Sequence, residues 1–291
     1  MPFEYVRPAT LAEALEFLAE HGPESRLLAG GTDLILEMQA KKASPRFVVD
    51  IGRLSELRGV RHVQHGAQAF IEVGALTTVR EVETSPLLAE EGRGLALAAA
   101  SLASVQVRNR ATLGGNICHA APSADTAPAL LVLDALAEIA GPGGTTLVPL
   151  DQFFLGPGRT LLGPCDILLG FRIPRPIARR GSTYLKHSPR RAMDCAVVGV
   201  GASISIVNGK TLDVRLALGA VAPTPMRALR AEMVLRQAGE LSPGALAEAA
   251  HEAAGEAKPI DDIRASAWYR RRMVEVCARR ALERAAMESA D

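Results

Sequence analysis

Apolar positions near the N-terminus follow the period of an amphipathic helix and then give way to short apolar runs. Leu11, Leu15 and Leu18 fall on one face of a helix that begins at Thr10, where a Thr-x-x-Glu pattern predicts a capping box. The short runs predict strands, at residues 26–29 and 47–51. Together these elements predict a small lobe in the order β-α-β-α-β, over about residues 1–56.

The next stretch alternates between strand and helix patterns and predicts a second lobe over residues 57–176. A further capping box, Thr78 with Glu81, marks the start of its first helix. Two hairpins and one more strand are expected, at residues 59–73, 137–148 and 166–173. Two longer helices are expected as well, at residues 94–105 and 126–136.

Pro174-Arg175-Pro176 interrupts the pattern, and a domain boundary is placed after it, between residues 1–176 and 177–291. The C-terminal part predicts three strands, at residues 182–187, 202–207 and 213–221. Asn208-Gly209 predicts a hairpin turn between the last two. Three helices follow, at residues 228–237, 243–256 and 265–286. The fold class is therefore α+β, a two-lobed domain followed by a smaller α/β domain with a three-stranded sheet plus helices.

Two pairs of adjacent glycines lie at the centre of polar turns. The first glycine turn is Leu27–Leu34, between a strand end and a helix expected from Thr32, and the second glycine turn is Thr112–Asn116. Adjacent glycines leave no Cβ atom to block a ligand, and successive amide groups can then face an anion. Thr112 and Asn116 add side-chain donors. The alternative is that each is an ordinary turn between two elements.

Two such turns, far apart in the chain, suggest two lobes that close on one extended anionic ligand. A dinucleotide diphosphate has a suitable size and charge. Neither turn has the Gly-x-Gly-x-x-Gly dinucleotide pattern, and neither has the phosphate loop that ends in Gly-Lys-Ser/Thr. A valine at Gly114 is expected to release this ligand, because its side chain would occupy the space of the diphosphate.

Charge and cysteine content narrow the function classes. Lys and Arg number 33 against 32 Asp and Glu, so no net field attracts nucleic acid or an anionic membrane. The longest membrane-like run, residues 197–207, is shorter than the ~20 residues of a membrane helix, and the start shows no signal peptide. Four scattered cysteines fit a reducing cytoplasm and give no thiolate set for an iron–sulfur cluster. No nucleophile–base motif and no metal-ligand set stands out, which favours chemistry that belongs to a bound cofactor.

The segments AGGTDL, QVRNRATLGGNI and PSAD resemble the FAD-binding medium subunit of the molybdenum hydroxylases, the family of xanthine dehydrogenase and carbon monoxide dehydrogenase. The resemblance extends from PFEYVRP at the start to the C-terminal helical region. It implies the two-lobed FAD-binding fold shared with p-cresol methylhydroxylase and vanillyl-alcohol oxidase, followed by the smaller domain. It also implies FAD as the cofactor.

The resemblance places both glycine turns at the FAD diphosphate and its neighbours. Asp125 matches a residue at the FAD site, although it could instead cap the helix that follows. Leu168 matches a backbone contact to the adenine or ribose end. Lys186 matches a lysine at the flavin, where a cation raises the reduction potential; otherwise it would be a solvated strand lysine. Cys195 matches a residue that packs on the isoalloxazine, or else is an ordinary buried thiol. The full set of site residues is Leu27, Leu28, Ala29, Gly30, Gly31, Thr32, Asp33, Leu34, Thr112, Leu113, Gly114, Gly115, Asn116, Asp125, Leu168, Lys186 and Cys195.

The family's mechanism implies a heteromeric complex. A large molybdopterin subunit hydroxylates the substrate, a small subunit with two [2Fe-2S] clusters passes electrons singly, and FAD in this chain hands them to an acceptor. The expected assembly is a dimer of heterotrimers. The loop Phe153–Thr160 resembles the FFxGYRKT loop of the NAD-using members but reads Pro-Gly-Arg at its core, so NAD, a quinone and another carrier all stay open as acceptors. The helix at 265–286 and the cluster Arg270-Arg271-Arg272 are candidates for docking a partner, or else a solvated face.

Two other classes of function compete with this reading. A free-standing FAD-dependent oxidase of the same fold would act on its own small substrate. The chain shows no His-Gly or Cys tether for covalent flavin and no substrate-binding cap of typical size, which weighs against it. A non-enzymatic FAD-binding or assembly module is the third possibility.

Overall fold

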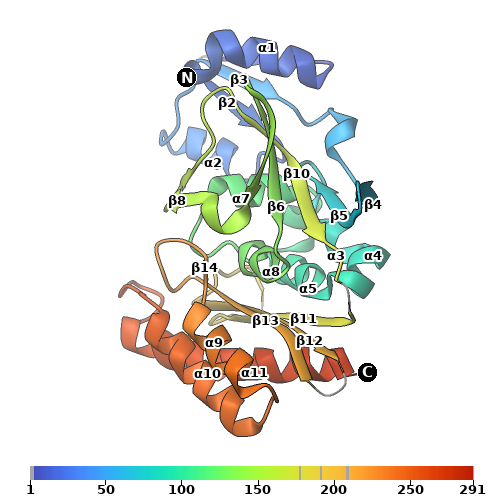
Figure 1. Cartoon of the computed structure of the whole chain (residues 1–291). Helices are drawn as coiled ribbons and strands as arrows, with labels where there is room; N and C mark the ends of the chain where they lie inside the picture. The colour runs from blue at the N-terminus through green and yellow to red at the C-terminus, as the bar shows by residue number, and fades with distance from the viewer. Residues whose placement is uncertain (1–2, 177, 191, 208–209, 291) are drawn as a thin grey trace.

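The computed structural model describes residues 3–176, 178–190, 192–207 and 210–290. Figure 1 shows an elongated molecule in three tiers: the N-terminal lobe at one end, the second lobe in the middle and the C-terminal sheet with its helices at the other end. The N-terminus and the C-terminus lie in opposite tiers (Figure 1). Both expected lobes and the expected C-terminal domain are therefore present.

The N-terminal lobe is a parallel three-stranded sheet with the strand order β1-β3-β2. Its elements are β1 (Glu4–Val6), α1 (Leu11–His21), β2 (Ser25–Leu28), α2 (Leu34–Gln39) and β3 (Phe47–Asp50). The side chain of Thr10 caps α1 by accepting a hydrogen bond from the Glu13 amide, at 3.2 Å. Because the strands are parallel, the ends of β2 and β3 emerge at one edge of the sheet, and this edge carries the first glycine turn.

The second lobe is built on an antiparallel sheet in the order β4-β5-β10-β6-β7. The strands are β4 (Val60–His65), β5 (Gln68–Gly74), β6 (Leu136–Gly141), β7 (Gly144–Pro149) and β10 (Ile167–Pro174), and a small hairpin joins β8 (Phe154–Gly156) to β9 (Arg159–Thr160). The helices are α3 (Val79–Thr84), α4 (Pro86–Glu91), α5 (Arg93–Ser101), α6 (Val105–Arg108), α7 (Leu113–His119) and α8 (Thr126–Val132). The capping box expected at Thr78 is confirmed.

Two expected elements of this lobe differ in their bounds, and one hairpin was not expected. The helix expected at 94–105 is two helices, because the chain breaks after α5 and the side chain of Ser104 caps α6. The helix expected at 126–136 ends at Val132, because Asp134 adopts a left-handed backbone with φ 57° and turns the chain into β6. The unexpected element is the β8–β9 hairpin.

The C-terminal domain is an antiparallel sheet in the order β11-β12-β13-β14. Its strands are β11 (Arg180–His187), β12 (Val198–Val207), β13 (Lys210–Gly219) and β14 (Met226–Arg227), and its helices are α9 (Leu229–Ala238), α10 (Pro243–Glu256) and α11 (Ala267–Ala290). The three long strands match the expectation, and the two-residue β14 adds an edge that was not expected. The expected turn Asn208-Gly209 lies outside the described residues.

Small residues let α8 pack directly on the C-terminal sheet. A Cβ atom on Gly201 of β12 would lie 2.6 Å from the Pro128 carbonyl oxygen, and one on Gly219 of β13 would lie 2.9 Å from the Pro128 ring. All seven residues of α8 are buried, and Figure 1 shows the helix between the two tiers. We call this contact the α8 seam. It brings the residues before α8 within reach of β11.

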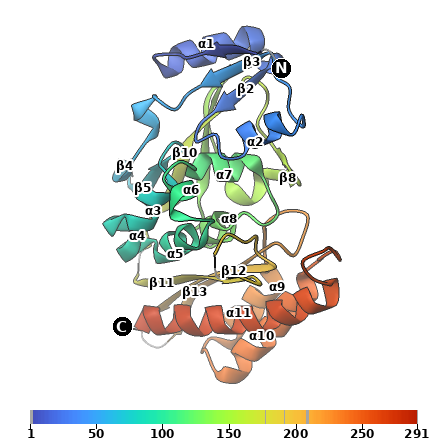
Figure 2. The same cartoon turned by 180° about the vertical axis from the view of Figure 1, so that it is seen from behind.

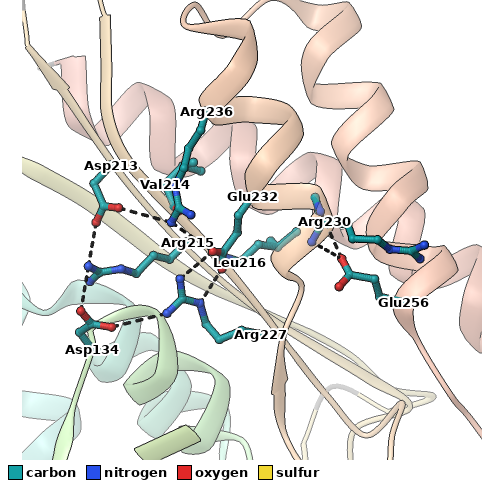
Figure 3. A network of polar contacts seen from close by, with 11 residues as sticks. Asp134, Asp213, Val214, Arg215, Leu216, Arg227, Arg230, Glu232, Arg236 and Glu256 are labelled. Carbon is teal, nitrogen blue, oxygen red and sulfur yellow. Dashed lines mark hydrogen bonds and ion pairs between the residues drawn. The ribbon is translucent and has the colours of Figure 1, made fainter. Parts of the chain in front are cut away.

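A polar network holds the other end of α8 to the C-terminal domain (Figure 3). Asp134 pairs with Arg215 at 2.8 Å and with Arg227 at 3.5 Å. Arg227 in turn binds Glu232, which is fully buried and also accepts from the Leu216 amide at 3.0 Å. Because a buried carboxylate needs several donors, this network fixes α9 against β13 as well as the two domains against each other.

Candidate functional site

The second glycine turn keeps its amide groups for the protein itself. The Leu113 amide donates to Thr77 O at 2.9 Å, and the Gly114 amide donates to Ala75 O at 2.8 Å. The Gly115 and Asn116 amides both donate to Thr112, at its Oγ1 (3.1 Å) and its carbonyl oxygen (3.0 Å). The expectation that successive amides of residues 113–116 face an anion is therefore wrong. These residues are instead the capped first turn of α7.

Gly114 is needed for packing inside the second lobe. A Cβ atom there would lie 2.7 Å from the Ala75 Cβ and 2.8 Å from the Ala75 carbonyl oxygen. A valine at Gly114 was expected to occupy the space of the diphosphate, and this reason is wrong. The added atoms would meet the protein backbone first, not a diphosphate.

The first glycine turn is open. Among the described residues, the amide groups of residues 29–33 have no hydrogen-bond acceptor. Gly31 has φ 77°, a left-handed conformation that suits glycine. Helix α2 begins at Leu34 and not at Thr32, so the turn is longer than expected and more of its amides stay free. Unpaired amides grouped in one turn form a donor set for an anion.

The leucine side chains of the first turn have apolar surroundings. Leu28 and Leu34 line an apolar pocket of about 390 Å³ together with Ile35 and Met38. Leu27 packs on the core of the N-terminal lobe. The only polar groups that these leucines can offer a ligand are those of their backbone.

The first glycine turn packs against the residues that lead into the second. A Cβ atom on Gly30 would lie 2.1 Å from the carbonyl oxygen of Arg110, two residues before the second turn. Helix α2, which follows the first turn, and helix α7, which contains most of the second, lie side by side in both views (Figures 1 and 2) and are joined by Glu37 and His119 at 3.6 Å. The fold therefore closes the N-terminal lobe on the second lobe at this point.

Leu168 also lies close to the second turn. It is buried in β10 beside a β-bulge between Leu168 and Gly170. The next residue, Leu169, accepts a hydrogen bond from the Ala75 amide at 2.8 Å, and Ala75 is the residue on which Gly114 packs. The strand that carries the predicted adenine-end residue and the second glycine turn thus meet at Ala75.

Asp125 is the centre of a buried polar group between the domains. Its Oδ1 accepts a hydrogen bond from the Tyr184 hydroxyl at 2.8 Å, and its Oδ2 accepts one from Lys186 Nζ at 2.8 Å. Lys186 also donates to the Ser101 carbonyl oxygen at 3.1 Å. Asp125 makes no side-chain cap for α8, so that alternative is wrong. Lys186 pairs with an aspartate, as a strand lysine would in the other alternative, but its side chain is only 10% exposed and is not solvated.

Burial raises the pKa of Asp125 above the usual carboxyl value, while Lys186 and Tyr184 act to lower it. The pKa of Tyr184 is raised well above its usual value, first by burial and then by the Asp125 charge. Thr126, the next residue along the chain, donates from Oγ1 to Asn116 Oδ1 at 2.7 Å. This bond links the Asp125 group to the second glycine turn and orients the Asn116 side chain.

Cys195 is exposed, in the segment between β11 and β12. Its amide donates to Asp194 Oδ1 at 3.0 Å. The alternative of an ordinary buried thiol is therefore wrong for Cys195. Such a thiol is found at Cys277 on α11 instead, where burial raises the pKa.

Three other features bear on the site. The β8–β9 hairpin is tied to the end of α7 by the Gly158 amide, which donates to Ala120 O at 3.0 Å.

Arg270 is buried and donates to Ala220 O at 2.7 Å, so the run Arg270-Arg271-Arg272 is not one exposed docking patch. Within the described residues, every helix is too short or too polar to span a lipid bilayer.

Sequence reasoning missed Tyr184 as a site residue. Tyr184 lies two positions before Lys186 on β11, and the side chains of a strand at positions i and i+2 share a face. That periodicity was the available signal. Lys186 also donates to the backbone carbonyl group of Ser101, which cannot be predicted from the sequence because every residue has such a group.

The donor set fits a dinucleotide cofactor. The open amides of residues 29–33 suit a diphosphate, and the Asn116 side chain lies at the neighbouring turn. The Lys186–Asp125 pair supplies a fixed cation and anion where the second lobe meets the C-terminal domain. These residues match the chemistry of FAD, which has an anionic centre and a polar ring system.

Comparison with known proteins gives the same result for nearly the whole chain. The family described as "FAD binding domain in molybdopterin dehydrogenase" matches residues 1–176, and "CO dehydrogenase flavoprotein C-terminal domain" matches residues 183–285. A putative xanthine dehydrogenase FAD-binding subunit, XdhB of Escherichia coli (strain K12), is 36% identical over 97% of this chain and 95% of its own length. The carbon monoxide dehydrogenase medium chain of Hydrogenophaga pseudoflava is 34% identical over 97% and 96%.

Solved structures agree with this assignment. A chain of carbon monoxide dehydrogenase from Hydrogenophaga pseudoflava superposes with a TM-score of 0.93, at 34% identity over 99% of this chain and 98% of that chain. A chain of quinoline 2-oxidoreductase from Pseudomonas putida 86 gives 0.91, at 29% identity over 100% and 99%. The chain therefore belongs to the FAD-binding medium-subunit family of the molybdenum hydroxylases, and FAD is its cofactor.

Proposed function

We propose that this chain takes electrons from the [2Fe-2S] clusters of a small partner subunit and passes them to a separate acceptor. A large molybdopterin subunit would hold the substrate and generate those electrons. The observation that carries the proposal is the presence of both an open first glycine turn and a lysine–carboxylate pair held between the domains, within a chain whose relatives are the FAD-binding or medium subunits of dehydrogenases.

The two glycine turns have different proposed roles at FAD. The amides of Ala29–Asp33 bind the diphosphate, since they have no acceptor among the described residues. The second turn supports this site from behind and offers the Asn116 side chain. Leu168 offers its backbone to the adenine or ribose end. FAD supplies the chemistry, because it can accept electrons one at a time and give up two.

Lys186 and Asp125 are proposed to face the isoalloxazine ring. The ammonium group stabilises negative charge on the pyrimidine side of the ring, and Asp125 keeps the ammonium in one place. Cys195, which is exposed, is proposed to pack against the ring from the C-terminal domain. These roles divide the chain into a FAD-binding domain at 1–176, with lobes of about 1–56 and 57–176, and a C-terminal domain at 177–291; residue 177 itself lies outside the described residues.

The proposed assembly is a dimer of heterotrimers in the cytoplasm. All four cysteines are free thiols, as expected in a reducing compartment. NAD and a quinone are both chemically suitable acceptors. The altered loop Phe153–Thr160 is proposed to discriminate between these two acceptors. It forms the β8–β9 hairpin next to α7.

Anaerobic reduction of the FAD-loaded chain tests the proposal. An artificial donor should bleach the flavin absorbance of the isolated chain. Purines, carbon monoxide or aromatic heterocycles should bleach it only after both partner subunits are added. Rapid bleaching by any of these substrates, or by small alcohols or amines, with the chain alone would contradict the heteromeric function and favour a free-standing oxidase.

A further inference from the structure

The hydroxyl group of Tyr184 occupies a space that a glycine leaves open. Tyr184 lies on β11, only 5% exposed, and Gly199 lies on the neighbouring strand β12. A Cβ atom on Gly199 would lie 2.5 Å from the Tyr184 hydroxyl oxygen. Any other residue at position 199 would therefore displace this hydroxyl group.

This hydroxyl completes the coordination of Asp125. The two carboxylate oxygens each have one side-chain donor, Tyr184 on Oδ1 and Lys186 on Oδ2, both at 2.8 Å. Both donors come from β11, whereas Asp125 comes from the second lobe. Without the hydroxyl, the carboxylate would be held at one oxygen only and could rotate away from Lys186.

We propose that Tyr184 is a positioning residue of the flavin site, which fixes Asp125 and thereby holds the Lys186 ammonium group in one place. This inference rests on the proposed function of Lys186 at FAD. Tyr184 itself is not assigned a contact with the cofactor. Its role is to keep the lysine–carboxylate pair in the ionised, correctly oriented form.

Among the described residues, Lys186 is the only ion-pair partner of Asp125. Other ionisable groups on the elements packed against α8 contact residues elsewhere. On β11, Arg180 donates to the Glu91 carbonyl oxygen at 3.2 Å and His187 contacts the Tyr269 hydroxyl group at 3.0 Å. Arg215 and Arg227 bind Asp134 at the far end of α8, Arg93 of α5 binds Glu288, and His119 of α7 binds Glu37. Cys118 on α7 and Cys277 on α11 are thiols whose pKa values are raised by burial. The charge of a Cys277 thiolate would raise the pKa of Tyr184.

The sign of the pH effect follows from this arrangement. The carboxylate form of Asp125 is the one that holds Lys186, so FAD affinity should fall as the pH falls through the pKa of Asp125. The Tyr184 bond lowers that pKa, against the raising effect of burial. Removing the hydroxyl should raise the pKa, and the loss of affinity should then begin at a higher pH.

The test is a pH profile of the FAD dissociation constant of the full chain, measured by quenching of flavin fluorescence. In Tyr184→Phe the inflection should move up by about one pH unit, a tenfold change in proton affinity. Tyr269→Phe is the matched control, because the Tyr269 hydroxyl contacts His187 of the same strand at 3.0 Å and not Asp125. Its inflection should stay at the wild-type pH. Asp125→Asn should remove the inflection altogether.

Gly199→Ala is a second route to the same hydroxyl, since it keeps the tyrosine ring and displaces its oxygen. It should move the inflection in the same direction. It keeps the proposal testable if the Tyr184→Phe chain does not fold. A wild-type profile without an inflection, or the same inflection in the wild type and in these variants, would overturn the proposal. Failure of the wild type to bind FAD would instead overturn the proposed function.

Discussion

The two glycine turns have similar sequences and opposite uses. Both contain Gly-Gly near a threonine, the first ahead of a short helix and the second in the first turn of one, yet the amides of residues 113–116 all have acceptors within the protein. The amides of residues 29–33 have none among the described residues. A Gly-Gly pair therefore permits close approach, and the neighbouring chain decides whether a ligand or the protein itself approaches.

Their positions in the fold explain the difference. The second turn lies against the segment that joins β5 to α3, whose carbonyl groups at Ala75 and Thr77 take up its amides. The first turn leaves the carboxyl end of a parallel strand, at the edge of a sheet where ligands bind in open α/β folds. Contact between Gly30 and Arg110 then makes the second turn a support for the first.

Alanine substitutions of the glycines should show most clearly which turn stabilises the fold and which turn binds FAD. Gly114→Ala should lower the free energy of unfolding of the FAD-free chain by ~3 kcal/mol, because its Cβ meets the backbone of Ala75. Gly31→Ala should cost only ~1 kcal/mol, from its left-handed backbone, but should weaken FAD binding at least about tenfold by moving the amides. Thermal unfolding and flavin titration measure the two effects.

Gly143→Ala is the matched control for both variants, because open space surrounds its Cβ position at the β6–β7 hairpin. It should change neither quantity. If Gly114→Ala left the stability unchanged and abolished FAD binding, the second turn would be a ligand site after all.

Removal of FAD should change amide exchange in the first turn only. With FAD at about 100 times its dissociation constant, exchange of residues 29–33 should slow by up to about a hundredfold, equivalent to ~2.7 kcal/mol. Residues 113–116 should exchange slowly with and without FAD, since their amides are already bonded. Hydrogen–deuterium exchange followed by mass spectrometry measures both segments in one sample. Strong protection of residues 29–33 in the FAD-free chain would contradict an open turn.

The two threonines should give the smallest contrast. Thr112→Ala removes the cap of α7 and should lower the stability of the FAD-free chain by ~1 kcal/mol. Thr32→Ala should stay within ~0.5 kcal/mol of the wild type, because the Thr32 side chain has no hydrogen-bond partner among the described residues. Denaturant unfolding of the two variants decides the point, and equal losses would mean that the first turn is also a structural cap.

Local patterns predicted the elements well where the interactions are local. The cap at Thr78, the hairpin at 59–73 and the helix at Pro243–Glu256 depend on residues a few positions apart, and each was predicted. Bounds failed where the backbone itself turns, as at Asp134, because a left-handed aspartate has no distinctive sequence pattern.

The site could be predicted as a set of segments but not as a geometry. Residue motifs identified both glycine turns, Asp125 and Lys186. Whether an amide is free depends on acceptors from distant segments, such as Ala75 for Gly114, and a single sequence does not show that contact. The same limit hid Tyr184, whose partner Asp125 lies 59 positions earlier, and the burial of Arg270.

The α8 seam also constrains how the protein is made. Helix α8 leaves the ribosome before β12 and β13 have been synthesised, so the face of α8 that packs on Gly201 and Gly219 has no cover at that stage. The FAD-binding domain therefore cannot bury this face until the C-terminal domain has been made. A chain truncated after residue 176 would keep α8 uncovered and Asp125 without its lysine, and would be prone to aggregate.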